Sequence, residues 1–464
     1  TLKRYAKTCN RIKVTHLPEN LGITKNTIEA VKLATGDYIT FLDHDDTLAK
    51  FALFEVVKAI NDNRPDILYS DEDKIMDNVR LFPFFKPIWS PDTLRSYNYI
   101  CHLSVYKKEL FDSIGGIREG FDGSQDYDLI LRATEKAQNI VHIPKMLYHW
   151  RMTKNSTSEN PESKEYAFVS GKKAIQEHLE RVGLRGTVKD GKFKGAYRVV
   201  DNLPERLPLV SIIIPNQNNY ELLKQCIESI ITKTSYRNYE IIIVENGSTQ
   251  KEVLDYYEQL KKFKGISKIK VIEWVGPIFN YSKINNDTVK QCNGEYLLFL
   301  NNDTKVINND WLSEMMGFAL REDVGIVGAK LYYEDGTIQH AGVAMRIGDT
   351  IGPFHPYCKH PGNTSGAVGK LYVAQNLTAV TGACLLTKRK VFEEVGGFDE
   401  NLVLAFNDIN FSLDVINKGY RIVWTPFAEL YHYESKTRGY EDTQEKVIRF
   451  EGEYRYLKNK WGKY

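Results

Sequence analysis

The chain has 464 residues, of which 42% are hydrophobic and 26% charged, with a formal net charge of +2. This length exceeds one ordinary hydrophobic core, so we expect two domains, and the near-neutral charge gives no sign of nucleic-acid binding. The six cysteines form no CxxC pair, which argues against zinc or a disulfide framework and favours a reducing cytoplasm. No apolar run approaches the ~20 residues of a membrane span, and no signal peptide is recognisable. The chain begins with Thr1 rather than Met, as a fragment would.

The first part of the chain is expected to alternate strands and helices. Residues 11–17 are predicted as a short strand, and residues 24–34 as a helix. An amphipathic helix over residues 51–61 and a strand over residues 67–69 follow later. We expect that second strand to end at the acidic residues Asp71 to Asp73.

The stretch GDYITFLDHDD at residues 36–46 organises the first half of the chain. Its β-branched and aromatic run stops abruptly at acids, which predicts a buried strand ending in a carboxylate cluster. Residues i and i+2 of an extended chain lie on the same side, so Asp43 and Asp45 are expected to share one Mg²⁺ or Mn²⁺ ion. The alternative is an acidic turn in which Asp46 or Thr47 caps the next helix.

Two further polar positions follow predicted elements of the first half. The stretch ICHLSVYKKELFDSIGGI predicts a strand that leads into a helix stopped at Gly115 and Gly116. Asp126 then stands at a helix N-terminus, where an acid is also favourable as a simple cap. His149 stands at the end of the strand VHIPKMLYHWR, where a lone histidine is usually structural. A helix is predicted over residues 163–182.

From Pro208 the pattern restarts with LVSIIIPNQNN, a continuous apolar strand of the kind covered on both faces. A helix over residues 220–232 and the strand EIIIVENGS complete a βαβ unit of mononucleotide-binding topology. Its strands end at Asn216 and at residues 245–248. The GxGxxG and P-loop fingerprints are both absent.

An internal repeat links the two halves. GEYLLFLNNDT follows GDYITFLDHDDT at an offset of 258 residues, and TGACLLTKRKVFEEVGGF follows ICHLSVYKKELFDSIGGI at an offset of 281. Duplication copies structural residues too, yet the same three polar positions recur on three different elements, which favours one converging site in each half. The predicted counterparts are Asp303 for Asp45, Asp408 for Asp126 and His432 for His149.

A cation held by acids and an imidazole, beside a nucleotide pocket and one separate carboxylate, suits group transfer from a nucleotide diphosphate. The metal would stabilise the leaving diphosphate, and the separate carboxylate would act as general base with inversion at the reacting carbon. In the first half the metal ligands are predicted to be Asp43, Asp45 and His149, with Asp126 as base. In the second half they are Asp303 and His432, with Asp408 as base.

These motifs resemble those of inverting family 2 glycosyltransferases of the GT-A fold, particularly the tandem-module enzymes of bacterial O-antigen, capsule and wall polysaccharides. The second half carries VSIIIPN, VENGS, FLNNDTKV, VTGACLL and LYHYES, and the first carries FLDHDD, YSDED, GFDGSQDYDL and YHWR. The resemblance implies an α/β protein of two tandem GT-A modules over residues 1–200 and 201–464. It also implies Mn²⁺ or Mg²⁺, a UDP- or dTDP-sugar donor, and a glycan or lipid-linked acceptor.

The resemblance further implies which residues contact the donor. Glu245 is the expected base-recognition residue, and Asp71 to Asp73 are expected to line the donor site of the first module. Two departures stand out, because the first module lacks the opening strand, helix and strand, and the second has Asn301-Asn302-Asp303 in place of Asp-x-Asp. The predicted donor-binding residues are Pro215, Asn216, Glu245, Asn246, Asn301, Asp71 and Asp73.

Two other functions and one surface stay open at this point. Nucleotidyl transfer onto a sugar phosphate uses a similar sheet but needs a Gly-rich, Arg-bearing loop that PNQNNYELLK does not contain. A degenerate module that only binds the acceptor is the non-enzymatic alternative. The terminal segment EGEYRYLKNKWGKY, with its lysines among aromatic residues, is either a solvated helix or a contact with the inner face of an anionic membrane.

Overall fold

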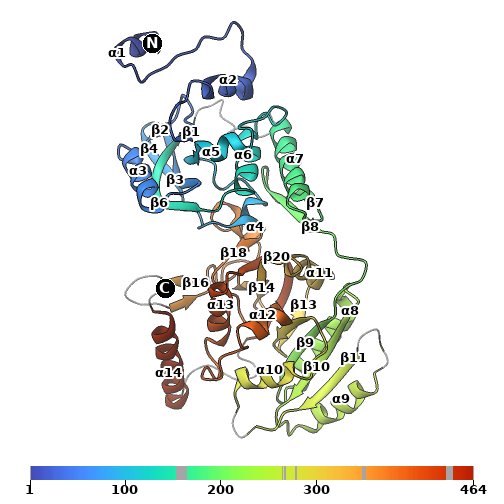
Figure 1. Cartoon of the computed structure of the whole chain (residues 1–464). Coiled ribbons are helices and arrows are strands. Elements are labelled where there is room, and N and C mark those ends of the chain that lie inside the picture. Colours follow the sequence, from blue (N-terminus) through green and yellow to red (C-terminus); the bar gives the residue numbers. More distant parts are fainter. Residues whose placement is uncertain are drawn as a thin grey trace. The chain divides into compact units, whose positions relative to one another are not determined.

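The structure, a computed structural model, describes residues 2–152, 165–263, 265, 268–276, 279–346, 352–434 and 443–462. The chain divides into two compact units, residues 1–199 and 200–464 (Figure 1). The elements of unit 1, with β8 crossing the boundary, are α1 (Leu2–Thr8), α2 (Gly22–Val31), β1 (Tyr38–Thr40), β2 (Thr47–Leu48), α3 (Ala52–Asn63), β3 (Ile67–Met76), β4 (Val79–Phe84), α4 (Pro91–Leu94), β5 (Ser104–Lys107), α5 (Lys108–Ser113), α6 (Gln125–Thr134), β6 (Ile140–Arg151), α7 (Glu165–Arg181), β7 (Gly186–Asp190) and β8 (Tyr197–Asp201).

Unit 2 begins with the predicted βαβ unit, to which the structure adds a third parallel strand. Its described elements are β9 (Val210–Asn216), α8 (Tyr220–Lys233), β10 (Tyr239–Glu245), α9 (Lys251–Lys261), β11 (Lys268–Glu273), α10 (Tyr281–Val289), β12 (Tyr296–Leu300), β13 (Thr304–Val306), α11 (Trp311–Ala319), β14 (Val324–Tyr332), β15 (Ile338–His340), β16 (Ala344–Arg346), β17 (Gly352–Phe354), η2 (Ala367–Tyr372), β18 (Gln375–Asn376), β19 (Cys384–Lys388), α12 (Arg389–Glu394), α13 (Asn407–Asn417), β20 (Arg421–His432) and α14 (Gln444–Trp461).

The central sheet of unit 2 separates two hydrophobic layers. Its strand order is β11-β10-β9-β12-β19-β14-β20-β13 over the described residues, with β15 and β18 added at its sides. Successive residues of a strand point to opposite faces, so Ile212 and Ile214 pack into the core with α8, α9 and α11. Ile213, between them, packs into the core with α10, α12 and α13. Both faces of the strand are therefore covered, which explains its unbroken apolar sequence.

The internal repeat of the sequence is also a repeat of strand order. In unit 1 the main path is β1-β5-β3-β6-β2, and in unit 2 the path β12-β19-β14-β20-β13 has the same order. The directions agree as well, since β3 and β14 run parallel to β6 and β20, whereas the other three neighbouring pairs are antiparallel in both units. Helices α5 and α12 end at the predicted Gly-Gly pairs, whose positive φ angles stop a helix.

The strand predicted at residues 11–17 is wrong, because that stretch has no regular structure. Its repeat counterpart in unit 2 is β11, which pairs in parallel with β10. No described strand of unit 1 lies in the position of β10. A strand is held by hydrogen bonds to a neighbour, so the same kind of sequence stays irregular where the neighbour is missing.

The second predicted strand continues through the acids at which it was expected to stop. Strand β3 runs to Met76 because the long strand β6 pairs with it in parallel from Ile67↔Ile140 to Ile75↔Arg151, and β4 pairs on its other side. Asp71 and Asp73 are therefore buried, at 3% and 4% exposure. Buried carboxylates need hydrogen-bond partners, and these acids have them within unit 1.

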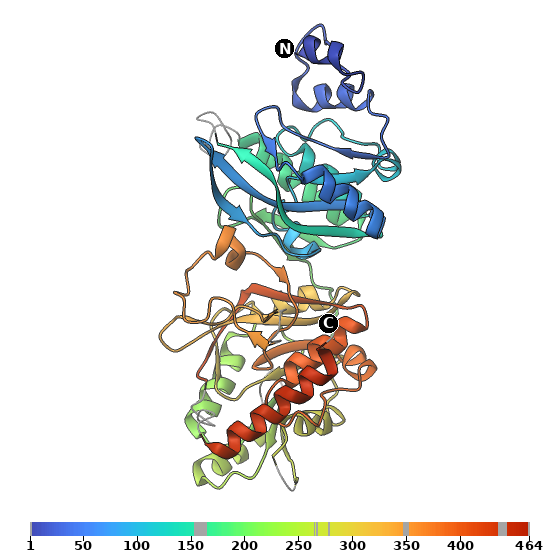
Figure 2. The same cartoon turned by 90° about the vertical axis from the view of Figure 1, so that its left-hand side faces the viewer.

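The terminal helix α14 packs on unit 2 through the side chains that carried the membrane prediction. Figure 2 shows α14, the long dark red helix, beside the helices of this unit. Trp461 is buried and donates its Nε1–H to Asn410 of α13 at 3.0 Å, and Lys460 pairs with Asp414 at 3.2 Å. Tyr456 donates to Asp399 at 2.8 Å. Lys463 and Tyr464 lie outside the described residues. Within those residues, no helix combines the length and apolar character needed to cross a membrane.

We predict that Phe299→Ala lowers the free energy of unfolding of unit 2 by about 3 to 5 kcal/mol. Phe299 is fully buried, and its ring centroid lies 4.7 Å from that of Phe398 and 5.4 Å from that of Phe392. Urea unfolding of the intact chain measures the loss. Leu254→Ala, at a residue that is 44% exposed, is the control and should cost less than about 1 kcal/mol. Equal losses in the two variants would contradict this packing.

Candidate active site

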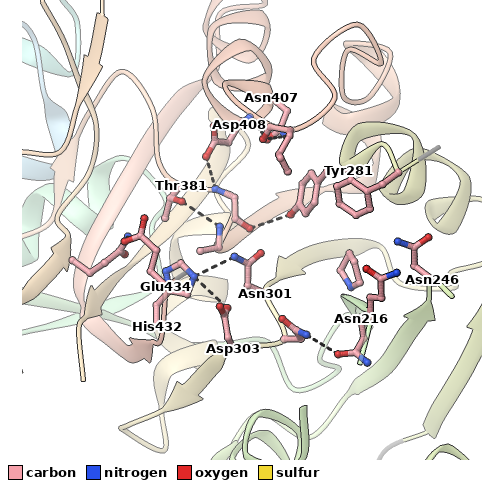
Figure 3. A pocket seen from close by; sticks show the side chains of 18 of the residues that line it. Asn216, Asn246, Tyr281, Asn301, Asp303, Thr381, Asn407, Asp408, His432 and Glu434 are labelled. Carbon is pink, nitrogen blue, oxygen red and sulfur yellow. Dashed lines mark hydrogen bonds and ion pairs between the residues drawn. The ribbon is translucent and has the colours of Figure 1, made fainter. Parts of the chain in front are cut away.

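A pocket of about 610 Å³ opens at the carboxyl ends of β9, β10 and β12 in unit 2. This is the edge at which open α/β sheets bind ligands. Figure 3 shows polar side chains from these strand ends, from the start of α13 and from the end of β20 pointing toward one another. Seven residues predicted from the sequence line this pocket: Pro215, Asn216, Asn246, Asn301, Asp303, Asp408 and His432.

Strand pairing places Asp303 beside His432. Thr304 of β13 pairs with His432 of β20, so the preceding Asp303 reaches the same edge. The distance from His432 Nε2 to Asp303 Oδ1 is 3.3 Å, and Asn301 Nδ2 lies 3.2 Å from His432 Nε2. Among the described residues, Asp303 Oδ1 accepts no hydrogen bond although it is buried. A buried anionic oxygen without a donor suits a hard cation.

The side-chain amides of two lining residues, Asn216 and Asn302, are held by hydrogen bonds. Asn302 donates its Nδ2–H to Asn216 Oδ1 at 2.6 Å, and Asn216 in turn donates to the Tyr257 hydroxyl at 2.7 Å. Glu245 lies outside the pocket lining. Its carboxylate accepts the main-chain N–H of Ser248 and the Ser248 hydroxyl, the latter at 2.7 Å. Glu245 therefore holds the turn after β10, and Asn246 is the residue of that turn that reaches the pocket.

Asp408 lies across the pocket from the Asp303 and His432 pair, in the first turn of α13. Its Oδ2 accepts the main-chain N–H of Gly382 at 2.7 Å. Burial raises the pKa of Asp408, while the N–H groups of Gly382 and Ile409 partly oppose that rise. A carboxylate with a raised pKa binds a proton more strongly, which suits a general base.

The pattern of strands and helices in the sequence did not predict several of the residues that line the pocket. Gln339, His355 and Thr381 come from the region between β14 and β19, and Arg449 comes from α14. The repeat offset grows from 258 to 281 residues across this region, so the sequence does reveal an insertion in the second half. It does not reveal that the insertion returns to the pocket, because that depends on the packing of β15 to β18.

In unit 1 Asp43 groups with Asp46 and His102 rather than with the predicted set of Asp45 and His149. The backbone does not stay extended here, since Asp46 N–H donates to Asp43 O at 3.2 Å and closes a turn. The turn brings residues i and i+3 together, so Asp43 groups with Asp46. Their carboxylates and His102 place ligand atoms within 4.8 Å of one another. The Oδ1 atom of Asp45 lies 3.9 Å from Nδ1 of His44.

The pairing register also changes which acid corresponds to Asp303. Thr47 pairs with His149 just as Thr304 pairs with His432, so the turn in unit 1 is one residue longer and Asp46, not Asp45, precedes the strand. His149 is not part of the group of Asp43, Asp46 and His102. Its Nδ1 lies 2.6 Å from Asp73 Oδ1.

The remaining predicted residues of unit 1 are also held by internal partners. Asp73 pairs with Arg80 at 2.6 Å in addition to His149, and Asp71 Oδ1 lies 2.8 Å from His142 Nε2. Asp126, the counterpart of Asp408, accepts a hydrogen bond from Asn98 Nδ2 at 2.9 Å. Burial raises the pKa of Asp126, opposed most strongly by the charge of His102.

Comparison with known proteins identifies the family. The sequence pattern of glycosyl transferase family 2 matches residues 1–115 and 211–396, well over half of the chain and parts of both units. The chain belongs to this family. The predicted α/β fold with tandem GT-A modules is therefore confirmed, and no described element of unit 1 corresponds to the opening βαβ unit of unit 2.

Two relatives match nearly the whole chain. The uncharacterized protein y4gI of Sinorhizobium fredii is 44% identical over 467 residues, which cover 99% of this chain and 51% of that protein. The O-antigen biosynthesis protein RfbC of Myxococcus xanthus is 38% identical over 442 residues, covering 94% of this chain and 34% of that protein. The chain thus spans about half or a third of these relatives. A crystal structure of GalNAc-T7 with UDP, GalNAc and Mn²⁺ is 18% identical, with a TM-score of 0.39 over 53% of this chain and 47% of that one.

We predict that the melting temperature of Asp408→Asn rises relative to that of the parent as pH increases above about 4, the ordinary pKa of aspartate. The folded-state pKa of Asp408 is raised, so its stabilising contribution is present at low pH and is lost as the buried carboxyl ionises. Thermal unfolding across this pH range measures the difference. Asp335→Asn is the control with the opposite sign, because hydrogen bonds from Thr337 lower the pKa of Asp335. A pH-independent difference for Asp408→Asn would contradict the burial argument.

Proposed function

We propose that unit 2 transfers a sugar, with inversion, from a nucleotide-diphosphate donor to a hydroxyl of a growing bacterial surface glycan. The observation that carries this proposal is the position of Asp408 across one pocket from Asp303 and His432. A base and a cation site on opposite sides of a reacting sugar suit direct displacement, because the acceptor and the leaving diphosphate occupy opposite sides of the carbon.

The donor half of the pocket is supplied by the parallel strands. The ends of β9 and β10 present Pro215, Asn216 and Asn246, whose amides suit a nucleotide held at the switch point of the sheet. Asp303, His432 and the amide of Asn301 would hold Mn²⁺ or Mg²⁺. When bound, the ion supplies positive charge to the leaving diphosphate. Arg449 is the only arginine or lysine lining the described pocket and adds a second positive charge.

The acceptor half is supplied by α13 and the residues before β19. Asp408 accepts the proton of the attacking hydroxyl, and the N–H group of Gly382 holds its carboxylate in place. The raised pKa of Asp408 increases its affinity for that proton. We assign base recognition to the turn after β10, with Glu245 acting through Ser248 rather than by direct contact.

For unit 1 we propose the same chemistry only in part. Asp126 keeps the position of the base, and Asp43 would share a cation with Asp46 and His102 rather than with Asp45 and His149. Asp71 and Asp73 support the histidines of β6 instead of contacting a donor. Unit 1 has no described counterpart of β9 and β10, so within this chain we assign donor binding to unit 2.

The relatives support a class of acceptor. The similarity to an O-antigen biosynthesis protein supports a glycan or lipid-linked acceptor, and the donor would be a UDP- or dTDP-sugar. We place the reaction in the cytoplasm, at the inner face of the membrane where the acceptor is lipid-linked. The outward face of α14, with Val447, Ile448 and Phe450 exposed, is the part of this helix left for such a peripheral contact.

We predict that Asp408→Asn lowers the transfer rate by about 10² to 10⁴-fold while donor affinity stays within a few-fold. A general base acts on the acceptor and contributes little to ground-state binding of the donor. The measurements are nucleotide release from UDP-glucose, UDP-galactose and dTDP-rhamnose, and calorimetric affinity for the donor that is used. Loss of donor affinity in this variant would instead make Asp408 a donor contact.

We predict that Asp303→Ala and His432→Ala each raise the Mn²⁺ concentration needed for nucleotide binding by about 10-fold or more. Both residues would supply ligands to one cation, and Asp303 Oδ1 has no donor within the described residues. Isothermal titration of UDP against Mn²⁺ measures the change. Glu322→Ala, at an exposed acid outside the pocket, controls for loss of surface charge. An unchanged Mn²⁺ dependence in both pocket variants would exclude the shared site.

A further inference from the structure

Two histidines meet at the wall of the pocket, next to Asp408. His340, at the end of β15, is fully buried, and His355, just after β17, lines the pocket. Their Nδ1 atoms lie 3.0 Å apart. If both imidazoles are neutral, one Nδ1 must carry a hydrogen and the other Nδ1 must accept it.

The main chain decides which ring is the donor. The N–H of Thr381 donates to His340 Nε2 at 3.4 Å, so that nitrogen carries no hydrogen. His340 must then carry its hydrogen on Nδ1 and donate it to His355 Nδ1. Because the Nδ1 of His355 accepts, its own hydrogen is on Nε2. One amide group thus sets the tautomers of both rings in turn.

Electrostatics keep both rings neutral. Burial lowers the pKa of His340 strongly, and the neighbouring His355 and His432 lower it further. His355 is open to the pocket, yet the protein around its ring still lowers the pKa of His355, and attraction to Asp408 only partly opposes this. The charged or titratable groups that face His355 are His340 from β15, Asp408 from α13, His432 from β20 and Glu434 after it.

We propose that this pair is locked in one tautomeric arrangement, so that His355 presents its Nε2–H group as a fixed donor to a hydroxyl oxygen of a sugar bound beside Asp408. The assignment rests on the proposed function of unit 2 and adds a sugar-binding residue to it. A locked His355 cannot remove a proton, since Nδ1 is engaged and Nε2 already carries hydrogen. Asp408 then remains the base, and His340 is a positioning residue that acts through His355.

The tautomer is tested without any activity measurement. Spectra of ¹⁵N-histidine in the intact chain should show His355 neutral, with hydrogen on Nε2, at pH 6 to 8. His360→Ala, at a histidine outside the pocket lining, is the matched control and should leave those signals unchanged. His340→Phe removes the Nδ1–H donor and should let His355 exchange tautomers, and His340→Ala, which also removes the donor, covers the case in which the larger ring prevents folding. A His355 with hydrogen on Nδ1, or a charged one, overturns the proposal.

The ligand role is tested by comparing a sugar nucleotide with its nucleotide. Loss of one such hydrogen bond costs roughly 10-fold in affinity. If the hydroxyl belongs to the donor, His355→Ala weakens UDP-glucose binding about 10-fold and leaves UDP binding unchanged. If it belongs to the acceptor, both affinities hold, and nucleotide release stimulated by methyl glycosides falls instead. His355→Gln, with an N–H near the place of Nε2, should restore most of the loss.

The two proposals fail in different ways. A parent chain that binds no nucleotide sugar but shows the locked tautomer would refute the proposed function and leave the histidine pair standing. If the parent and His355→Ala release nucleotide at equal rates, bind the donor with equal affinity and respond equally to methyl glycosides, only the ligand role of His355 is refuted.

Discussion

The antiparallel pairing of β13 with β20 is the constraint on which the pocket of unit 2 depends. Three residue pairs, ending at Thr304↔His432, hold the chain after β12 against the end of a strand that arrives more than a hundred residues later. Strand β20 is itself fixed by its parallel register with β14. Without this pairing Asp303 and His432 would have no reason to meet, because Asp303 precedes one strand and His432 ends another.

The same pairing explains why two copies of one pattern give two different sites. Both units pair the threonine after the acids with the histidine, but unit 1 has one more residue in its turn. That residue lengthens the turn, so Asp43 groups with Asp46 and His102 in unit 1, whereas Asn301, Asp303 and His432 lie together in unit 2. In unit 1 His149 also contacts Asp73 of the long strand β3. The described residues that line the pocket of unit 2 include no acid from β14, the counterpart of β3. A single insertion and one acid on a neighbouring strand therefore suffice to redirect the histidine.

Several polar groups in the pocket of unit 2 are buried at a cost to the free energy of folding. Asp408 keeps its carboxylate in a place that favours the protonated form, Asp303 has an oxygen to which no described residue donates, and His340 is enclosed as a neutral ring. Each of these arrangements opposes folding and is tolerated where the sheet and both hydrophobic layers hold the backbone. This explains why the polar groups gather at the strand ends rather than within the strands.

The sequence by itself determined the two-unit α/β architecture, the strands and helices with a regular apolar pattern, and seven lining residues of the pocket, because periodicity and repetition are local properties of the chain. It could not determine which acid of LDHDD turns toward its neighbours, since that depends on the backbone between residues 43 and 46. Nor could it determine that residues 11–17 would lack a partner strand, or that Asp71 and Asp73 would lie inside a continuing strand. The inserted region that brings His340 and His355 to Asp408 was visible only as a change of repeat offset. Its return to the pocket was decided by the tertiary structure, because contacts between distant strands and loops follow from packing and not from spacing.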